Sequence, residues 1–260
     1  MFFNASKCRV MHVGRGNECY DYFMGDTLVE ATREEKDLGV YINNNLSPSS
    51  HVAKVVEKAN RVLGMIKRTY VNRSMENILS LYKSLVRPHL EYCVQAWRPF
   101  LQQDIDNIER VQRRATRMIS ELANLEYSER LRRCNLTILE IRRHRANLLE
   151  VYRIVHGMED LDPGKFFVFR DDREGRESRG HNLHILKQRF SLMVRRFCFL
   201  QRVVDHWNAL SAEAVNAPTI NVFKNYVDPL LKQRAGLTIS QRRLLTPITR
   251  ATDDQYVYYM

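Results

Sequence analysis

The spacing of apolar residues changes about fifty positions into the chain. Before that point, apolar and polar residues alternate over short runs at 8–13, 20–24 and 38–42, and Gly14, Gly25 and Asn43 lie beside them. Alternation bounded by such residues is typical of short β-strands joined by turns. We therefore predict antiparallel hairpins within residues 1–46.

From residue 47 onward, apolar residues recur every three or four positions, which indicates amphipathic helices. Ser47 and Pro48 form a typical helix start. The first predicted helix carries an aliphatic stripe made of Val52, Val55, Val56, Ala59, Val62, Leu63 and Ile66. A second helix around 78–86 is expected to end or kink at Pro88, and a third covers 104–122.

The remaining pattern predicts further helices and two irregular segments. Thr137 and Glu140 match a capping box, and Gly157 is placed as a C-terminal cap. The polar segment 159–182 is expected to be an exposed loop, a last helical unit follows at about 187–210, and the tail 236–260 lacks periodicity, as disordered tails do. The chain is thus predicted to be mainly α, with short antiparallel β-hairpins at its N-terminus.

Charge is unevenly distributed along the 260 residues. The formal net charge is +11, but the first fifty residues carry −2, so the helical remainder carries +13. An excess of this size favours an anionic partner such as nucleic acid. The basic surface therefore belongs to the helices.

The cysteine and hydropathy patterns favour an intracellular protein, cytoplasmic or nuclear. The five cysteines are scattered, which is unlike a secreted disulfide framework or a zinc motif. No apolar run is long enough to span a membrane, and no signal peptide is evident. His181 and His184 stand three residues apart, but zinc needs four ligands at recognisable spacing, so no metal site is expected.

The candidate binding residues are bases on two of the predicted helices. On the third helix, four arginines recur at helical spacing opposite the apolar stripe, and guanidinium groups match phosphates in charge and geometry. They are Arg110, Arg113, Arg114 and Arg117. On the first helix the candidates are Lys54, Lys58, Arg61, Lys67 and Arg68. An ordinary solvated basic face is the alternative. Large aromatic residues such as Tyr82, Tyr92, Trp97 and Trp207 are predicted to pack in the core.

Several motifs, in order, resemble one protein family. They are FNASKCRVMHVG at 3–14, EKDLGV at 35–40, YKSLVRPHLEYC at 82–93 with QAW at 95–97, and RVQRRATR at 110–117, with weaker matches at 179–181 and 202–208. This sequence is similar to the C-terminal part of LINE-type, non-LTR retrotransposon reverse transcriptases, which are RNA-directed DNA polymerases.

The resemblance implies a layout for the chain. Residues 1–46 would be strands at the edge of the palm, with Leu38, Gly39 and Val40 in a hairpin like the primer grip. Residues 47–125 would form the thumb that holds the template–primer duplex, and 126–235 a helical C-terminal extension. The family's catalytic aspartates, which bind Mg²⁺, lie upstream of the first motif. We therefore expect a truncated, non-polymerising fragment without a cofactor.

The expected partners follow from the same resemblance. They are an RNA or DNA duplex and a separate polymerase palm segment, with no membrane and no small-molecule substrate. The alternative function is that of a non-catalytic helical interaction or structural protein, or of a retroelement remnant without a selected role. Phe169-Arg170-Asp171-Asp172 resembles a polymerase loop only superficially, because its predicted surroundings are a polar linker.

Overall fold

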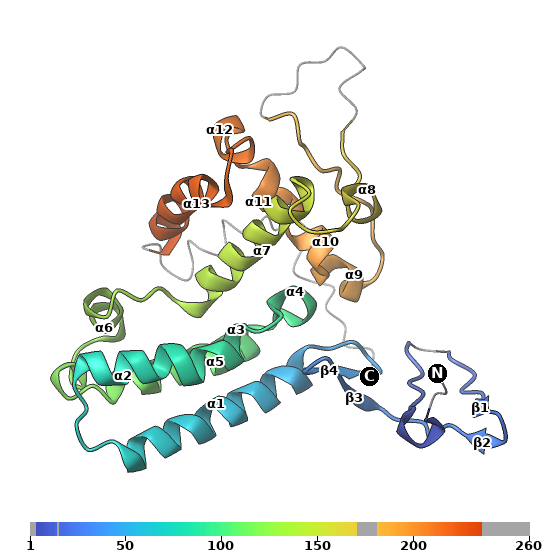
Figure 1. Cartoon of the computed structure of the whole chain (residues 1–260), viewed down its shortest axis with the longest axis horizontal. Coiled ribbons are helices and arrows are strands. Elements are labelled where there is room, and N and C mark those ends of the chain that lie inside the picture. Colours follow the sequence, from blue (N-terminus) through green and yellow to red (C-terminus); the bar gives the residue numbers. More distant parts are fainter. Residues whose placement is uncertain (1–3, 15, 171–180, 236–260) are drawn as a thin grey trace, which may run out of the picture. The chain divides into compact units, whose positions relative to one another are not determined.

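A computed structural model describes residues 4–14, 16–170 and 181–235 (Figure 1). The chain is mainly α-helical, with a 3-10 turn at Ala5–Lys7 and two small antiparallel sheets near the N-terminus, which confirms the predicted fold class. It forms two compact units. The first contains residues up to Asn147 together with Arg189–Gln201, and the second contains Leu148–Gln188 with the described residues from Arg202 onward. The predicted tail 236–260 and the pair Asp171-Asp172 lie outside the described residues.

The first hairpin joins β1 (Phe23–Met24) to β2 (Thr27–Leu28), in agreement with the turn predicted next to residue 24. The strand predicted at 8–13 is wrong. Only Val10 pairs there, through a single parallel bridge to Ala31. An alternating pattern forms a strand only where a neighbouring segment supplies a ladder, and this segment has one bridge.

The second hairpin joins β3 (Glu34–Asp37) to β4 (Val40–Asn43). The strand predicted at 38–42 therefore starts two residues too early. Leu38 and Gly39 have φ angles of 43° and 89° and form the turn. A two-residue turn with both φ values positive matches the twist of the flanking strands. Of the three residues predicted for a primer-grip-like hairpin, only Val40 lies in a strand.

Helix α1 (Ser49–Thr69) carries the predicted stripe inward. Val52, Ala59, Leu63 and Ile66 are buried, and Val55, Val56 and Val62 are half-buried against them. Pro48 precedes the first turn, and the Ser47 hydroxyl accepts a hydrogen bond from the Ser49 N–H at 3.3 Å. The predicted start of this helix is thus confirmed to within two residues.

The second helical run continues beyond its predicted end. It consists of α2 (Met75–Leu81), the π-helical turn η2 (Tyr82–Val86) and α3 (Arg87–Glu91), and α4 (Val94–Trp97) follows. Proline removes a donor and crowds the carbonyl four residues earlier. The wider π turn, in which the Arg87 N–H donates to the Tyr82 carbonyl, ends two residues before Pro88 and accommodates it.

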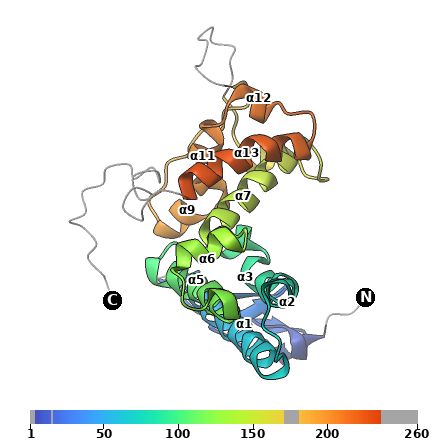
Figure 2. The ribbon, with the colours of Figure 1, turned by 90° about the vertical axis from the view of Figure 1, so that its left-hand side faces the viewer.

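Helix α5 (Gln102–Arg117) and the 3-10 turn η3 (Ser120–Leu122) replace the single helix predicted at 104–122, and α6 (Tyr127–Arg133) follows. Helices α1 and α5 lie side by side, and the α2–α3 run packs on both (Figure 1 and Figure 2). Their apolar stripes form the core of the first unit. Its largest fully buried apolar members are Tyr82, Ile66, Ile78, Leu90, Ile108, Ile119, Leu122 and Leu139.

Helix α7 (Leu139–Val155) ends as predicted and begins differently. Gly157 has φ 61°, and the Met158 N–H donates to the Arg153 carbonyl, as in a glycine-terminated helix. The helix begins at Leu139, too late for the predicted capping box. A carboxylate from another helix satisfies the Leu139 N–H instead, as described below.

The second unit packs around Trp207, which is fully buried. Its helices are α8 (Pro163–Phe166), α11 (Val204–Asn208), α12 (Ala212–Val215) and α13 (Ile220–Ala235). The predicted helix at 187–210 is broken into short pieces, since α9 (Met193–Phe197) and α10 (Phe199–Arg202) precede α11 and residues 187–192 are not helical. Residues 159–182 are not wholly exposed, because Phe167 and His181 are buried.

Candidate nucleic-acid interface

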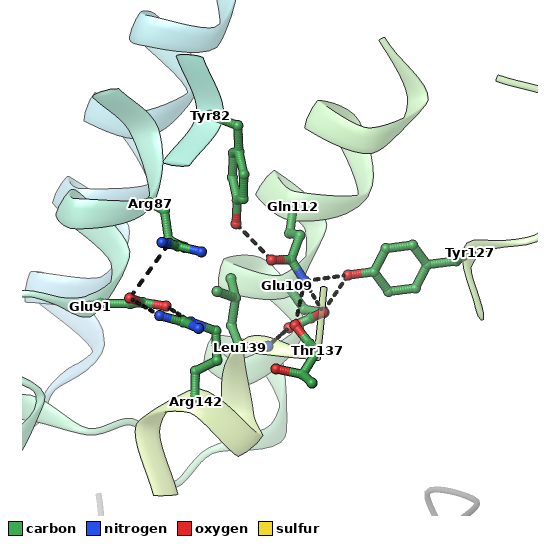
Figure 3. Close-up of polar contacts among 9 residues, drawn as sticks. All are labelled: Tyr82, Arg87, Glu91, Glu109, Gln112, Tyr127, Thr137, Leu139 and Arg142. Carbon is green, nitrogen blue, oxygen red and sulfur yellow. Dashed lines mark hydrogen bonds and ion pairs between the residues drawn. The ribbon is translucent and has the colours of Figure 1, made fainter. Parts of the chain in front are cut away.

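A buried polar network holds α5 in one orientation (Figure 3). The Tyr82 hydroxyl donates to Gln112 Oε1 at 2.8 Å, and Gln112 Nε2 donates to the Tyr127 hydroxyl and the Thr137 carbonyl at 3.0 Å each. Gln112 and Tyr82 are almost fully buried, so each polar atom needs a partner inside the protein. The network therefore links α5 to three neighbouring segments.

Glu109 extends this network to α7. Its carboxylate accepts hydrogen bonds from the Tyr127 hydroxyl and from the Leu139 N–H, the latter at 2.8 Å. Burial raises the pKa of the Glu109 carboxyl, and these hydrogen bonds oppose the rise. The carboxylate thus takes the capping role that the sequence pattern assigned to Thr137. Polar residues on the apolar side of a predicted helix were the available signal for this network.

With one side of α5 held in this way, its arginines point outward. Arg110, Arg113, Arg114 and Arg117 are all exposed, as their spacing predicts. Arg110 and Arg117 are seven residues apart and therefore share a face. Neither has a hydrogen-bond or ion-pair partner within the part of the chain that the structure describes.

Two contacts show that α1 and α5 run parallel. The Ser49 hydroxyl donates to Asp104 Oδ2 at 2.6 Å near the start of both helices, and Arg114 Nη1 donates to Asn60 Oδ1 at 2.9 Å further along. From the first contact to the second, α1 advances by eleven residues and α5 by ten. The two helices therefore run in the same direction and stay nearly in register. The exposed arginines of α5 therefore lie along the α1 side chains that flank Asn60.

The far ends of the two helices are also joined. Arg73 Nη2 donates to the Lys67 carbonyl at 3.2 Å, and the Ser120 N–H donates to the Arg73 carbonyl at 3.2 Å. Lys67 shares the face of Asn60, because seven residues make almost two turns. We define the α1–α5 seam as the polar residues along this junction. They are Asn60, Lys67, Arg110, Arg114 and Arg117, together with the exposed Arg68, which follows Lys67 in the last turn of α1 and lies at the edge of the junction.

The other predicted bases lie elsewhere or are already engaged. Lys54 forms an ion pair with Glu34 and lies over the Tyr41 ring, 4.2 Å from its centre, so it holds the β3–β4 hairpin. Arg61 pairs with Glu57 at 2.6 Å. Lys58 lies off the Asn60 face of α1. Burial lowers the pKa of His89 in α3, and the charge of Lys58 lowers it further.

Arg113 is exposed but is directed to α6. Its guanidinium lies 4.9 Å from the centre of the Tyr127 ring, a cation–π contact. The hydroxyl of the same Tyr127 side chain is hydrogen-bonded to Glu109 and Gln112. Arg113 therefore borders the α1–α5 seam without belonging to it.

The β3–β4 turn is held by a residue expected in the core. Tyr92 is 56% exposed, and its hydroxyl donates to the Leu38 carbonyl at 2.9 Å. Core packing is confirmed for Tyr82, Trp97 and Trp207 and is wrong for Tyr92. The turn is thus fixed by the residue that follows α3, and the primer-grip-like role of Leu38, Gly39 and Val40 stays a prediction.

His51 joins β4 to α1. Its Nδ1 accepts the Tyr41 N–H at 3.1 Å, and its ring lies 4.5 Å from that of Trp97. Burial lowers the pKa of His51 to about 4, so the imidazole is neutral near pH 7. A neutral ring is required here, because Nδ1 is the hydrogen-bond acceptor.

His181 and His184 form a stacked pair with ring centres 4.5 Å apart. His181 accepts the Leu183 N–H at Nδ1, so its Nε2 donates to the Trp207 carbonyl. No group of three or more His, Cys, Asp or Glu side chains suited to a metal occurs within the described ranges. All five cysteines carry free thiols.

Across these same ranges, no helix is long and apolar enough to cross a membrane. Comparison of the chain with protein-family models, curated proteins and solved structures found no match.

Proposed function

We propose that this chain binds the phosphate backbone of a nucleic-acid duplex through the α1–α5 seam. The observation that carries the proposal is the alignment of Arg110, Arg114 and Arg117 beside Lys67 and Arg68 along two parallel helices. Arginine donates in a planar fork that matches phosphate oxygens. Contacts of this kind position a protein on nucleic acid and carry little sequence information.

The sequence resemblance extends this proposal to a reverse-transcriptase thumb that holds a template–primer duplex. The proposed activity is binding without polymerisation. A template-extension assay with the purified chain checks the second part, and synthesis by the chain alone would contradict it.

The binding proposal is tested with two matched double variants. Arg110→Ala/Arg117→Ala removes two seam charges that have no partner among the described side chains. Arg132→Ala/Arg133→Ala removes two charges from α6 that both pair with Glu129. Both variants lose two positive charges. A difference in their affinity for the duplex therefore shows where on the surface the duplex binds.

The readout is fluorescence anisotropy with an RNA–DNA duplex at about 100 mM salt, where charges farther than about 10 Å apart are screened. The seam variant should bind roughly ten- to a hundredfold more weakly, as expected when charged hydrogen bonds to phosphate are lost. The α6 variant should stay within about twofold of the wild type. Equal losses in the two variants, or no binding by the wild type, would favour the interaction-protein alternative.

A further inference from the structure

The loop that joins α1 to α2, residues 70–74, is anchored at its base; we call it the tip loop. It lies at the end of α1 opposite the β3–β4 hairpin (Figure 1). The hydrogen bonds from Arg73 to the Lys67 carbonyl and from Ser120 to the Arg73 carbonyl fix its backbone. Inside the loop, the Ser74 N–H donates to Asn72 Oδ1 at 3.1 Å.

This anchored loop presents apolar side chains to solvent. Val71 is 92% exposed, which is more than any other large apolar residue in the described part of the chain, and Tyr70 beside it is 42% exposed. Covering these two side chains would gain free energy in proportion to the apolar area removed from water.

Cations of the α1–α5 seam gather at the base of the tip loop, where the exposed carboxylates of Glu76 at the start of α2 and Glu121 in η3 also lie. Lys67 and Arg68 lie in the last turn of α1, and Arg117 lies in the last turn of α5, just before Ser120. These three cations outnumber the two carboxylates, so the charge at the base of the loop favours a partner that is anionic around its apolar contact. Arg110 and Arg117 continue the positive charge along α5 for about 10 Å, which suits a linear phosphate backbone better than a flat anionic surface.

We propose that the tip loop inserts Val71, with Tyr70 beside it, into the minor groove of the bound duplex. Lys67, Arg68 and Arg117 then bind phosphates that flank the groove. Proteins that enter the minor groove combine cations with apolar wedges between base steps. In an RNA–DNA duplex of A-like form, the minor groove is the wide and accessible one, and the major groove is too narrow for side chains. This inference rests on the proposed function.

The substitution Val71→Ser tests the wedge, and Leu192→Ser is the control. Leu192 is 69% exposed in the same unit and lies outside the seam. Binding of each purified chain to an RNA–DNA duplex is measured by anisotropy over a range of salt concentrations. Phosphate contacts set the slope of log K against log salt, whereas an apolar contact changes K at every salt concentration alike.

Val71→Ser should therefore weaken binding by about tenfold with an unchanged slope. A duplex with 2-aminopurine at successive positions should brighten at one step with the wild type and not with Val71→Ser, because a wedge unstacks that base. Leu192→Ser should match the wild type in both measurements.

The outcomes separate this inference from the proposed function. If the wild type binds with a steep salt slope and Val71→Ser binds equally well, duplex binding by the α1–α5 seam is supported and insertion of Val71 is refuted. A shallower slope for Val71→Ser would also overturn the wedge. If the wild type binds no duplex, the proposed function itself fails. Val71-dependent binding to phosphatidylserine vesicles in place of the duplex would assign the tip loop to a membrane surface and overturn the inference.

Discussion

Removal of the Tyr82 hydroxyl should destabilise the first unit more than its small size suggests. Tyr82→Phe leaves Gln112 Oε1 without the hydrogen bond that it accepts at 2.8 Å, and both side chains are at most 1% exposed. A buried acceptor left without a partner costs about 1–3 kcal/mol. Tyr92→Phe is the matched control, because it removes a hydroxyl of the same chemistry from a side chain that is 56% exposed.

Thermal unfolding measures the difference between these two variants. For a domain of 150–250 residues, 1 kcal/mol shifts the midpoint by about 2–4 °C, so a cost of about 1–3 kcal/mol should make Tyr82→Phe lower it by roughly 2–12 °C. Tyr92→Phe should change the unfolding free energy by less than about 0.5 kcal/mol. A shift for Tyr82→Phe no larger than the control's would refute the view that this network holds α5 in place.

Three further variants test other parts of the first unit. The pKa of His51 in the folded protein is about 4, below its ordinary value of 6.5. The contribution of the neutral ring to the free energy of unfolding is therefore fully present above pH 6.5 and is lost as the pH falls from 6.5 to 4. His51→Gln keeps an acceptor for the Tyr41 N–H and does not titrate. Urea unfolding at pH 7 and pH 4.5 should show that the variant loses up to about 3 kcal/mol less stability on acidification than the wild type. Identical losses in the two proteins would contradict this. Gly39→Ala should destabilise the fold by about 1 kcal/mol or more in the same urea assay, because φ is 89° and the added Cβ would lie 3.2 Å from the Tyr92 ring. Gly64 lies in the interior of α1 with only the end of Arg68 nearby, so Gly64→Ala should stabilise the fold by about 0.5–1 kcal/mol. If both glycine variants changed the stability in the same direction, the contrast between the turn glycine and the helix glycine would be refuted.

The two long helices α1 and α5 were predictable because each buries a continuous apolar stripe. The stripe from Val52 to Ile66 has the period of a helix, and the same period places Arg110 and Arg117 on the opposite, exposed face of α5. The short strands were less predictable. A four-residue ladder such as β3–β4 depends on a turn whose φ values decide which residues pair, and Leu38 at a positive φ is an unusual choice.

Contacts between distant residues explain the remaining differences. At the start of α7 the predicted capping box at Thr137 is replaced by Glu109, whose carboxylate accepts the N–H of Leu139 thirty residues further along the chain. The π turn before Pro88 lets the helix continue where local rules predict that it ends. The same holds for the interface. Lys54 pairs with Glu34 twenty residues away, so its engagement cannot be seen from the spacing of bases on α1.

The position of the bound duplex tests the central claim most directly. Lysine acetylation, read by mass spectrometry with and without an RNA–DNA duplex, reports which ammonium groups the nucleic acid covers. Lys67 lies on the α1–α5 seam, whereas Lys83 on η2 and Lys165 on α8 are exposed and lie outside it. We predict that the duplex protects Lys67 and leaves Lys83 and Lys165 reactive. Unchanged labelling of Lys67, with protection of Lys83 or Lys165 in its place, would contradict the assignment of the seam as the binding surface.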